Sequence, residues 1–395
     1  MTHALSILAP IQTTELDLQA WFTAAQPSQC YSPVNLAFIE AMSRQLLAPS
    51  NKAFPELVAL GFWLREIARG KSNNVSIDSL SVQKPLGVLA HFTPANVDTM
   101  FFYSWVCGVL MGNCNLVRVA TQSTQVQQRL FELLNELLSL PEFQPVSQRN
   151  LFVQYDKQSH WSAEISLNAD ARVIWGGDDS VNSIRSLPTK PRARDISFAD
   201  RYSAAVIKEH GMSSADLQQT AINFWRDSSP FMQQACSSPR LLFWCGSELG
   251  FEAFQKDLVQ ASALNHPDSV QARNEQLVTA QSILAQSGGE YQFAGPFCMI
   301  RPHHYHPGYL QFHAGYLVFI IVFIDAIDAV AEYIDDKLQT LSYAGFSKSE
   351  ITGLVNSING SGLDRAVPVG HALDFDTRWD GFDLLESFSR HVTIQ

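Results

Sequence analysis

The stretch LGVLAHFTPANVDTMFFYSWVCGVLMGNCNLVRVA, residues 86–120, decides the fold class. Its two ends, GVLAHF and NLVRVA, are short apolar runs of the kind that form strands buried on both faces. The segment between them is long enough for a helix and ends on Gly112-Asn113, a typical helix C-terminus. A strand, a helix and a strand in this order predict a βαβ unit and a largely parallel sheet.

The same alternation continues along the chain. Further strand-like runs, separated by helical patterns, are NLFVQY, ARVIWGG, RARDISF and YSAAVIK, the last ending at residue 208. A second α/β series follows, and its most apolar run, YLVFIIVFI (316–324), has the length of a buried strand rather than of a membrane span. We therefore expect an α/β protein with one domain over 1–208, a second over 209–360, and a C-terminal tail over 361–395.

Composition narrows the classes of function. The chain has 395 residues, is 46% hydrophobic and carries a net charge of −11. Binding to nucleic acid or to anionic membranes needs clustered Lys and Arg, so an acidic chain of this kind favours neither. Its six cysteines show no CxxC pair, which predicts free thiols in a reducing compartment. Without a basic N-terminal region or a long apolar segment, we expect a cytoplasmic protein with no membrane span.

Two turns follow predicted parallel strands, where such sheets bind their ligands. The first contains Thr93, Pro94 and Asn96. An amide side chain there can donate a hydrogen bond to an oxyanion, although an Asn that caps the next helix is the plainer interpretation. The second turn contains Gly176 and Gly177, which allow the backbone to approach a phosphate closely.

The second turn is ambiguous because Asp178 and Asp179 follow it directly. Carboxylates at a helix N-terminus suit the helix dipole but repel a phosphate. The segment also lacks the GxGxxG pattern, so a simple tight turn explains it equally well.

Cys236, in FMQQACSSPR (231–240), is a candidate nucleophile at the end of a polar turn. A thiolate is nucleophilic, and nearby amides or cations can favour it; Arg240 is the one charged residue close by in the sequence. The other interpretation, a buried structural cysteine, fits the thiols in apolar runs better: Cys107, Cys114, Cys245 and Cys298.

Four histidines in RPHHYHPGYLQFH (301–313) invite a metal interpretation. No Asp, Glu or Cys is interleaved with them, and in an extended chain His303 and His304 point to opposite faces. Surface or substrate-channel histidines are therefore the favoured interpretation, and we expect no metal site.

Taken together, these segments resemble the aldehyde dehydrogenase superfamily and, within it, the acyl-CoA reductases of the bioluminescence type (LuxC-like). Five blocks in order carry the resemblance: KPLGVLAHFTPANVD, GVLMGNCNLVRVATQST, ARVIWGGDDSVNSIRSL, DISFADRYSAAVI and FMQQACSSPRLLF. They cover about residues 82–245, and the tail LDRAVPVGHALDFDTRWDGFDLLESFSR also resembles the family's end. The resemblance implies a Rossmann-type cofactor domain over 1–208 and an α/β catalytic domain over 209–360. The tail would return to the cofactor domain or to an oligomer interface.

The resemblance also implies an activity, the NAD(P)H-dependent reduction of an acyl thioester, either acyl-CoA or an acyl protein, to an aldehyde. Cys236 would carry the acyl group, while Asn96 and the amide of Cys236 would hold the oxyanion. The implied partners are a homo-oligomer and, as in many relatives, an acyl-protein synthetase. The residues implied in cofactor binding are Thr93, Pro94, Arg118, Thr121, Gly176, Gly177, Ser180 and His313.

Three positions depart from the superfamily. Ser197 stands where hydrolytic relatives have a glutamate base, Arg118 replaces a lysine, and His313 lies near the glutamate that clamps a ribose. Without a base to activate water, an acyl-enzyme should persist until it is reduced. Arg118, with Thr121 and Ser123, can meet a 2′-phosphate, so we expect NADPH, with NADH as the alternative cofactor.

Two other classes of function stay open. The departures at Arg118 and His313 also suit a non-catalytic relative that binds an acyl carrier or a partner enzyme, and quenching of tryptophan fluorescence by cofactor would separate it from a reductase. A cysteine acyltransferase or thioesterase would use Cys236 without hydride transfer, and release of free acid instead of aldehyde would reveal it.

Overall fold

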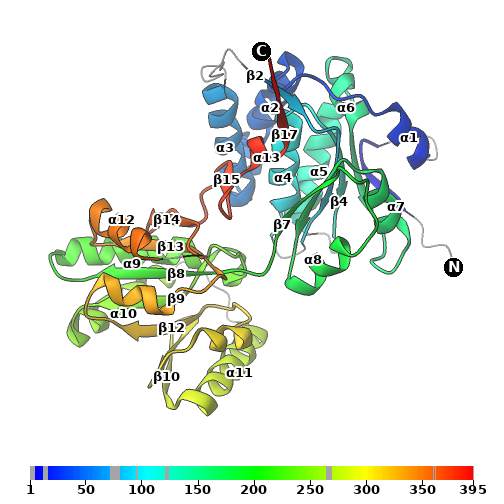
Figure 1. Ribbon diagram of the computed structural model, residues 1–395. Coiled ribbons are helices and arrows are strands. Elements are labelled where there is room, and N and C mark those ends of the chain that lie inside the picture. The colour runs from blue at the N-terminus through cyan, green and yellow to red at the C-terminus, as the bar shows by residue number, and fades with distance from the viewer. Residues whose placement is uncertain are drawn as a thin grey trace. The chain divides into compact units, whose positions relative to one another are not determined.

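A computed structural model describes residues 5–11, 17–71, 81–94, 97–120, 124–263, 269–358, 360 and 362–394. The chain forms two compact units, each with its own sheet (Figure 1). Unit 1 comprises Met1–Ala199 and Phe375–Gln395, and unit 2 comprises Asp200–Asp374. No described helix is both long and apolar enough to cross a bilayer.

Unit 1 is built on a six-stranded sheet in the order β1-β5-β4-β3-β6-β7. All neighbours are parallel except β1, which runs antiparallel to β5. The chain moves outward from β3 through β4 to β5 and then returns to β6 on the other side of β3. In sheets of this kind, ligands bind at the carboxyl ends of the strands where the order reverses, so the ends of β3 and β6 are the expected place for a ligand. The strands are β1 (Ser6–Ala9), β3 (Val88–Phe92), β4 (Cys114–Arg118), β5 (Asn150–Gln154), β6 (Ala171–Trp175) and β7 (Arg194–Phe198).

Helices cover both faces of this sheet, as the predicted βαβ units require. The helix between β3 and β4, α4, is buried at every residue, which explains why its sequence is apolar all round. Two antiparallel ribbons complete unit 1: β2 (Ser81–Pro85) with β17 (Ser389–Thr393), and β15 (Arg378–Trp379) with β16 (Phe382–Asp383). The helices are α1 (Leu18–Ala24), α2 (Pro33–Leu46), η1 (Pro49–Asn51), α3 (Pro55–Lys71), α4 (Met100–Leu110), α5 (Gln125–Leu138), η2 (Pro141–Phe143), α6 (Gln144–Arg149), α7 (Trp161–Asn168), α8 (Asp178–Arg185) and α13 (Leu384–Ser387).

A chain of buried hydrogen bonds crosses the core of unit 1. The Trp175 indole N–H donates to Ser104 Oγ over 3.2 Å, and Ser104 Oγ lies 2.8 Å from His91 Nδ1. His91 Nε2 lies 3.1 Å from Asn115 Oδ1, and an amide oxygen can only accept, so the neutral ring carries its proton on Nε2. This chain fixes Trp175, the last residue of β6, and with it the start of the turn that follows.

Burial lowers the pKa of His91 from its ordinary 6.5 to about 4. Below pH 6.5 the unfolded chain therefore takes up a proton that the folded chain refuses, so stability falls as the pH drops from 6.5 towards 4. We expect this residue to cost about 3 kcal/mol of unfolding free energy over that range. Urea denaturation of the wild type and of His91→Gln at several pH values measures the difference, and parallel curves for the two proteins would contradict it.

Unit 2 holds a seven-stranded sheet in the order β10-β11-β12-β9-β8-β13-β14, parallel except at the edge strand β10. Helices α9 and α10 pack on one face, while α11, α12 and the short η4 and η5 pack on the other. The strands are β8 (Tyr202–Lys208), β9 (Pro239–Cys245), β10 (Gly289–Ala294), β11 (Phe297–Pro302), β12 (Val318–Phe323), β13 (Leu338–Ala344) and β14 (Arg365–Pro368). The helices are α9 (Ser214–Ser228), η3 (Pro230–Gln233), α10 (Glu248–Ser262), α11 (Val270–Ser287), η4 (Pro307–Phe312), η5 (Ile327–Tyr333) and α12 (Lys348–Ser357).

The units divide at a different place from the predicted boundary at residue 208. Strand β8, expected in the first domain, lies between β9 and β13 in the second sheet, and unit 2 begins at Asp200. The C-terminal region predicted as one tail, residues 361–395, is divided between the two units. β14 extends the sheet of unit 2, whereas residues from Phe375 onward return to unit 1, where β17 pairs with β2. A strand's own sequence does not specify which sheet it joins, so the boundary was placed one strand too late.

Candidate active site

The carboxyl edge of the unit 1 sheet gathers most of the residues expected to bind a cofactor. Thr93 directly follows β3 and is 3% exposed. Its hydroxyl donates to the carbonyl of Arg118 over 2.8 Å, which ties the end of β3 to the end of β4. Pro94 comes next and is partly exposed. Thr93 therefore shapes this edge through its bond to the backbone of β4.

Arg118 is the last residue of β4 and is 8% exposed. Its guanidinium carbon lies 5.7 Å from the centre of the Tyr155 ring, and it forms no ion pair or side-chain hydrogen bond with another described residue. Burial lowers the pKa of Arg118, an effect that Tyr155 and Asp156 partly offset, yet a guanidinium stays charged at neutral pH. A buried cation that has no ion-pair partner within the described part of the chain makes this edge attractive to an anion.

The turn after β6 leaves space at the start of α8. Gly177 is the N-cap of α8, and a side chain built there would meet nothing within 4 Å. Ser180, in the first turn of α8, is exposed. Asp178 and Asp179 also lie in this first turn, as the sequence indicated. The free N–H groups of the helix start can face a phosphate, while the two carboxylates oppose one.

Cys236 lies in unit 2, in the turn between η3 and the amino end of β9, and is partly exposed. Three residues before this turn have left-handed backbone, although none is glycine: Phe231 (φ 53°), Met232 (φ 52°) and Gln233 (φ 64°). Each such residue costs on the order of 1–3 kcal/mol, and such strain persists where the surroundings impose it, often at functional sites.

Side-chain hydrogen bonds impose this conformation. The buried Gln233 amide donates to the carbonyls of Pro239 and Val318, and its oxygen accepts from the Val318 N–H, all within 2.8 Å. Ser203, in β8, donates to the carbonyl of Cys236 over 2.7 Å. The cysteine turn is therefore held by β8 and β12, a rigid support for a nucleophile.

His313 does not suit the role expected from its position near the ribose clamp. It is 6% exposed, its Nδ1 accepts from the Gly315 N–H, and its Nε2 lies 2.9 Å from the carbonyl of Val318. Burial, followed by the nearby Arg240 charge, lowers its pKa to about 3, so the ring is neutral. Both ring nitrogens are hydrogen-bonded to the backbone beside the cysteine turn, so neither is available to a ribose hydroxyl in this conformation.

Other thiols are less suited to nucleophilic chemistry. Burial raises the pKa of Cys30 to about 11 and those of Cys114 and Cys298 to about 12, and it also raises the pKa of Cys245. These four thiols are protonated at neutral pH. Cys107 is fully buried within α4. Cys236 thus remains the candidate nucleophile.

Arg240 is the cation that the structure places in the electrostatic surroundings of Cys236. Burial lowers the pKa of its guanidinium, while Asp200 and Cys236 raise it. Its Nε is buried and has no hydrogen-bond partner among the residues that the structure describes, and its Nη1 lies 3.5 Å from the carbonyl of His313. Because electrostatic interactions are mutual, a cation stabilised by Cys236 also favours the thiolate.

Replacing Arg240 by methionine is therefore expected to slow alkylation of Cys236 by iodoacetamide at pH 7 by roughly threefold to tenfold. Arg240→Lys should retain part of the rate, and Arg226→Met, at an exposed position of the same unit, should retain all of it. Mass spectrometry of the peptide that contains Cys236 measures the rate. Equal rates in all four proteins would show that Arg240 does not act on the thiol.

Three other residues named in the sequence-based predictions lie outside the described residues: Asn96, Thr121 and Ser123. Their assignments stay predictions. Within the described ranges, no three His, Cys, Asp or Glu side chains come together as a metal site. Tyr155 and Gln233 were missed. Tyr155 directly follows β5, the strand that pairs with β4, and a polar aromatic residue at a strand end is a signal that the sequence carries. Nothing in the sequence marked Gln233 as the anchor of the cysteine turn.

Several solved structures share this fold. Aldehyde dehydrogenase 21 from Physcomitrella patens aligns over 94% of this chain and 86% of its own, with 9% identity and a TM-score of 0.66. An oxidoreductase from Marinobacter aquaeolei aligns over 95% and 88%, with 12% identity and a TM-score of 0.68. Bifunctional proline utilization A has a TM-score of 0.69 and 14% identity over 95% of this chain, which spans only 43% of that protein. No curated protein matches the sequence.

Two α/β units, the first doubly wound, define a protein with the aldehyde dehydrogenase fold. Residues 62–285, more than half of the chain, match the acyl-CoA reductase (LuxC) family. The chain belongs to this family, as the sequence blocks indicated. Because the family is one of acyl-CoA reductases, this match supports an oxidoreductase.

Proposed function

We propose that the protein reduces an acyl thioester to an aldehyde through an acyl-enzyme on Cys236, with NADPH as the reductant. The observation that carries the proposal is the cysteine turn, a partly exposed thiol on a strained loop fixed by Ser203 and Gln233, in a chain of the acyl-CoA reductase family. The proposal assigns covalent chemistry to unit 2 and cofactor binding to unit 1.

The residues of unit 1 suit a dinucleotide. The Arg118 guanidinium, which stacks on Tyr155 and has no ion pair among the described residues, would meet an anionic or hydroxyl group of the adenosine half, and the open backbone at Gly177 would face the pyrophosphate. Asp178 and Asp179 disfavour the second contact. When bound, the cofactor supplies the hydride.

Acylation exchanges one thioester for another. The Cys236 sulfur bonds to the acyl carbon, the bond from that carbon to the donor sulfur breaks, and the donor leaves as a thiol with the proton that Cys236 gives up. Because the bond formed and the bond broken are of one kind, the step needs positioning more than driving force. The immobilised turn supplies that positioning.

Reduction then releases the product. Hydride addition converts the acyl carbon on Cys236 into a tetrahedral thiohemiacetal anion, which collapses to aldehyde and a cysteine that regains a proton. Overall, one acyl thioester, one reduced cofactor and one proton give one aldehyde, one thiol and one oxidised cofactor. Water competes only if a base activates it, and the hydroxyl at Ser197, buried without a described hydrogen-bond partner, cannot serve as that base.

The proposal is tested on the intact protein with decanoyl-CoA as probe. Mass spectrometry should show one decanoyl group per chain without cofactor, and added NADPH should remove it while decanal forms. Free decanoate in place of decanal would indicate a thioesterase. An unmodified protein that still binds decanoyl-CoA would indicate a non-catalytic relative.

Arg118 is expected to make the enzyme prefer NADPH. A charged hydrogen bond to the 2′-phosphate contributes about 1.5–3 kcal/mol, so Arg118→Met should lower kcat/KM with NADPH by about tenfold or more and leave NADH nearly unchanged. Steady-state rates with both cofactors measure the difference. Arg118→Lys keeps the charge without the planar fork, so its kcat/KM with NADPH should lie between the values of the wild type and of Arg118→Met. A parallel loss with both cofactors would show that Arg118 does not recognise the 2′-position.

A further inference from the structure

The sheet of unit 2 ends on one side at β10, whose outer edge pairs with no strand that the structure describes (Figure 1). Residues Gly289 to Phe293 of this strand are all exposed. The residues that precede β10, in α11, and those that follow it, in the turn to β11, are described as well. An unpaired edge of this kind offers backbone N–H and C=O groups to another extended chain.

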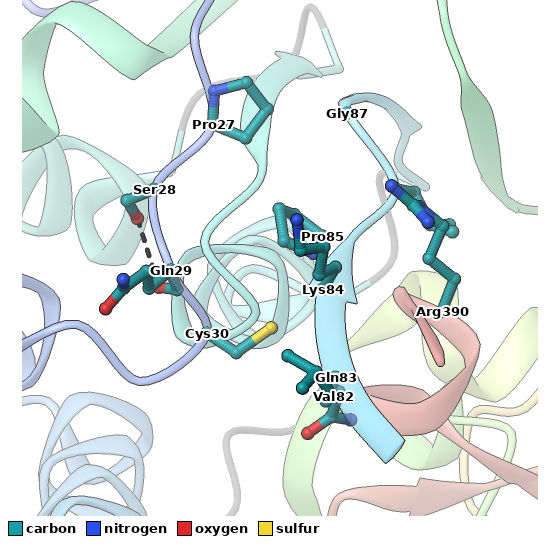
Figure 2. A pocket seen from close by; sticks show the side chains of 11 residues that line it. Pro27, Ser28, Gln29, Cys30, Val82, Gln83, Lys84, Pro85, Gly87 and Arg390 are labelled. Atoms are coloured by element: carbon teal, nitrogen blue, oxygen red, sulfur yellow. Dashed lines mark hydrogen bonds between the residues drawn. The ribbon is translucent and has the colours of Figure 1, made fainter. Parts of the chain in front are cut away.

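The antiparallel ribbon of unit 1 differs in this respect. Its strand β2 lines a pocket of about 700 Å³ together with Pro27–Cys30 and Arg390 (Figure 2). Residues 72–80, which come directly before β2, lie outside the described residues. The neighbours of β10 are therefore better defined than those of β2.

The face of β10 that is turned towards α11 is apolar and exposed. It carries Tyr291 and Phe293, which are 40% and 41% exposed and whose ring centroids lie 5.6 Å apart, edge to face. The guanidinium carbon of Arg273, in α11, lies 4.9 Å from the centre of the Phe293 ring. β10 contains neither Lys nor Pro, the residues with which natural edge strands resist pairing. A second strand at this edge would cover both rings.

The other face of β10 is acidic. Glu290 is opposite Arg301 in the β10–β11 register, and its carboxylate lies 3.9 Å from that guanidinium. Arg301 also pairs with Glu248 over 2.6 Å, and Glu252 lines the same hollow beside the edge. Because carboxylates outnumber cations on this face, a strand with a carboxylate can add to the edge only in a register that keeps its charge away from Glu290.

β10 itself meets these conditions when two copies pair antiparallel about Gln292. Each Tyr291 is then opposite a Phe293, and such aromatic pairs stabilise a ladder. Each Glu290 is opposite an Ala294, which separates the two carboxylates by about 13 Å along the strands. That separation exceeds the Debye length of about 8 Å at physiological salt, so their repulsion is weak.

Other antiparallel registers of the same two strands fit less well. A register centred on Glu290 places the two carboxylates directly opposite each other, and one centred on Tyr291 leaves each Phe293 opposite a glycine, Gly289. A slip of a single residue would bring the aromatic face of one copy against the acidic face of the other. The sequence of β10 therefore favours one register, centred on Gln292.

We propose that two copies of this chain pair edge to edge through β10, antiparallel and centred on Gln292, so that the sheets of two unit 2 domains become continuous. The same strand serves both copies, so the contact has twofold symmetry. A strand from a different protein could use the same edge, but the self-complementary register favours a second copy. The pairing does not involve Cys236 and stands apart from the proposed reaction.

Charges placed at Gln292 test both the contact and its register. Gln292→Lys and Gln292→Glu each oppose two like charges across the twofold axis, so each variant should self-associate at least about tenfold more weakly than the wild type. An equimolar mixture of the two variants opposes Lys to Glu and should recover the wild-type assembly. Sedimentation velocity at roughly 0.1 mM protein measures the mass, which should halve in each variant alone and return in the mixture.

Gln218→Lys and Gln218→Glu are the matched controls, because Gln218 is an exposed glutamine on α9 of the same unit, and both should keep the wild-type mass. Circular dichroism checks the folding of every variant. An unchanged mass in the Gln292 variants, or a mixture that does not recover, would overturn the proposal. So would a wild type that sediments as a single chain, because the edge of β10 would then have a different occupant.

A crosslinking experiment provides a second measurement of the register. Directly opposite residues have Cβ atoms about 4.5–5.5 Å apart, close to the reach of a disulfide. Gln292→Cys should therefore form a crosslinked dimer under mild oxidation, as seen by electrophoresis without reductant. Tyr291→Cys, which is opposite Phe293, should crosslink no more than the wild type with its own thiols. Equal crosslinking of the two variants would contradict the register centred on Gln292.

Discussion

Cys236→Ala is expected to abolish both the covalent acyl adduct and aldehyde formation, while cofactor binding persists. Removing a nucleophile that forms the covalent intermediate typically costs a factor of about 10⁴–10⁶ in turnover. Intact mass after incubation with decanoyl-CoA reports the adduct, and gas chromatography reports decanal. Quenching of tryptophan fluorescence by NADPH should be unchanged, because the proposal assigns cofactor binding to unit 1.

Cys245→Ala is the matched control. It removes the other partly exposed thiol of unit 2, whose pKa is raised by burial, and it should keep both the adduct and the activity. Cys236→Ser keeps the size of the side chain but offers a weak nucleophile, so it should behave like Cys236→Ala. If Cys236→Ala still gains a decanoyl group, another thiol carries the acyl chain and the assignment of Cys236 is wrong.

The central strands of both sheets were predictable because parallel strands buried on two faces read as uninterrupted apolar runs, whereas the edge strands β1, β10 and β14 lack that pattern and were not predicted. VLAHF and CNLVR became β3 and β4, buried at every residue, and the run over 316–324 contains β12. Each pattern is local, because a strand that is buried on both faces needs an apolar sequence whichever sheet it joins. The order of strands within a sheet is set by contacts between distant segments, and no local pattern reports it.

Because local patterns do not report contacts between distant segments, two elements were misjudged, β8 and α11. β8 has the same apolar pattern in either sheet, so the boundary at 208 could not be corrected from its sequence. α11 was not recognised because much of its buried face is small or polar, with Gln276, Thr279 and Ser287 beside Ala280 and Ile283. Gln276 donates to the carbonyls of Pro296 and Tyr316, and such a bond leaves no trace in a hydropathy pattern.

The motifs of the candidate site indicate residue types, but they do not report the backbone conformation that the structure shows. The position of Cys236 before a strand followed from its motif, whereas the left-handed backbone at Phe231 and Met232 did not, because side chains of this kind rarely adopt it. For His313, residue type and conformation point in different directions. Its place in the sequence suggested a ligand contact, and the structure gives both of its nitrogens to the backbone.

Asn96→Ala tests the second catalytic assignment, which rests on the family motif that follows β3. Acyl transfer and hydride addition both pass through a tetrahedral oxyanion, so the loss of one amide donor should slow both steps. The expected fall in kcat is about 10²–10³-fold, with little change in the KM for decanoyl-CoA. Single-turnover experiments measure the two steps separately, acylation by mass spectrometry and reduction by NADPH absorbance.

The sequence also allowed a helix-capping role for Asn96, although the N-cap residue of α4 is Thr99. That role predicts a different outcome, and Asn96→Asp separates the two. Aspartate caps a helix as well as asparagine does, but its carboxylate cannot donate a hydrogen bond and repels an oxyanion. If Asn96 is a catalytic donor, Asn96→Asp should be at least as slow as Asn96→Ala, with the stability of the wild type. If Asn96 is only a cap, Asn96→Ala should lose about 1 kcal/mol of unfolding free energy while Asn96→Asp keeps both stability and turnover, and the oxyanion assignment would fail.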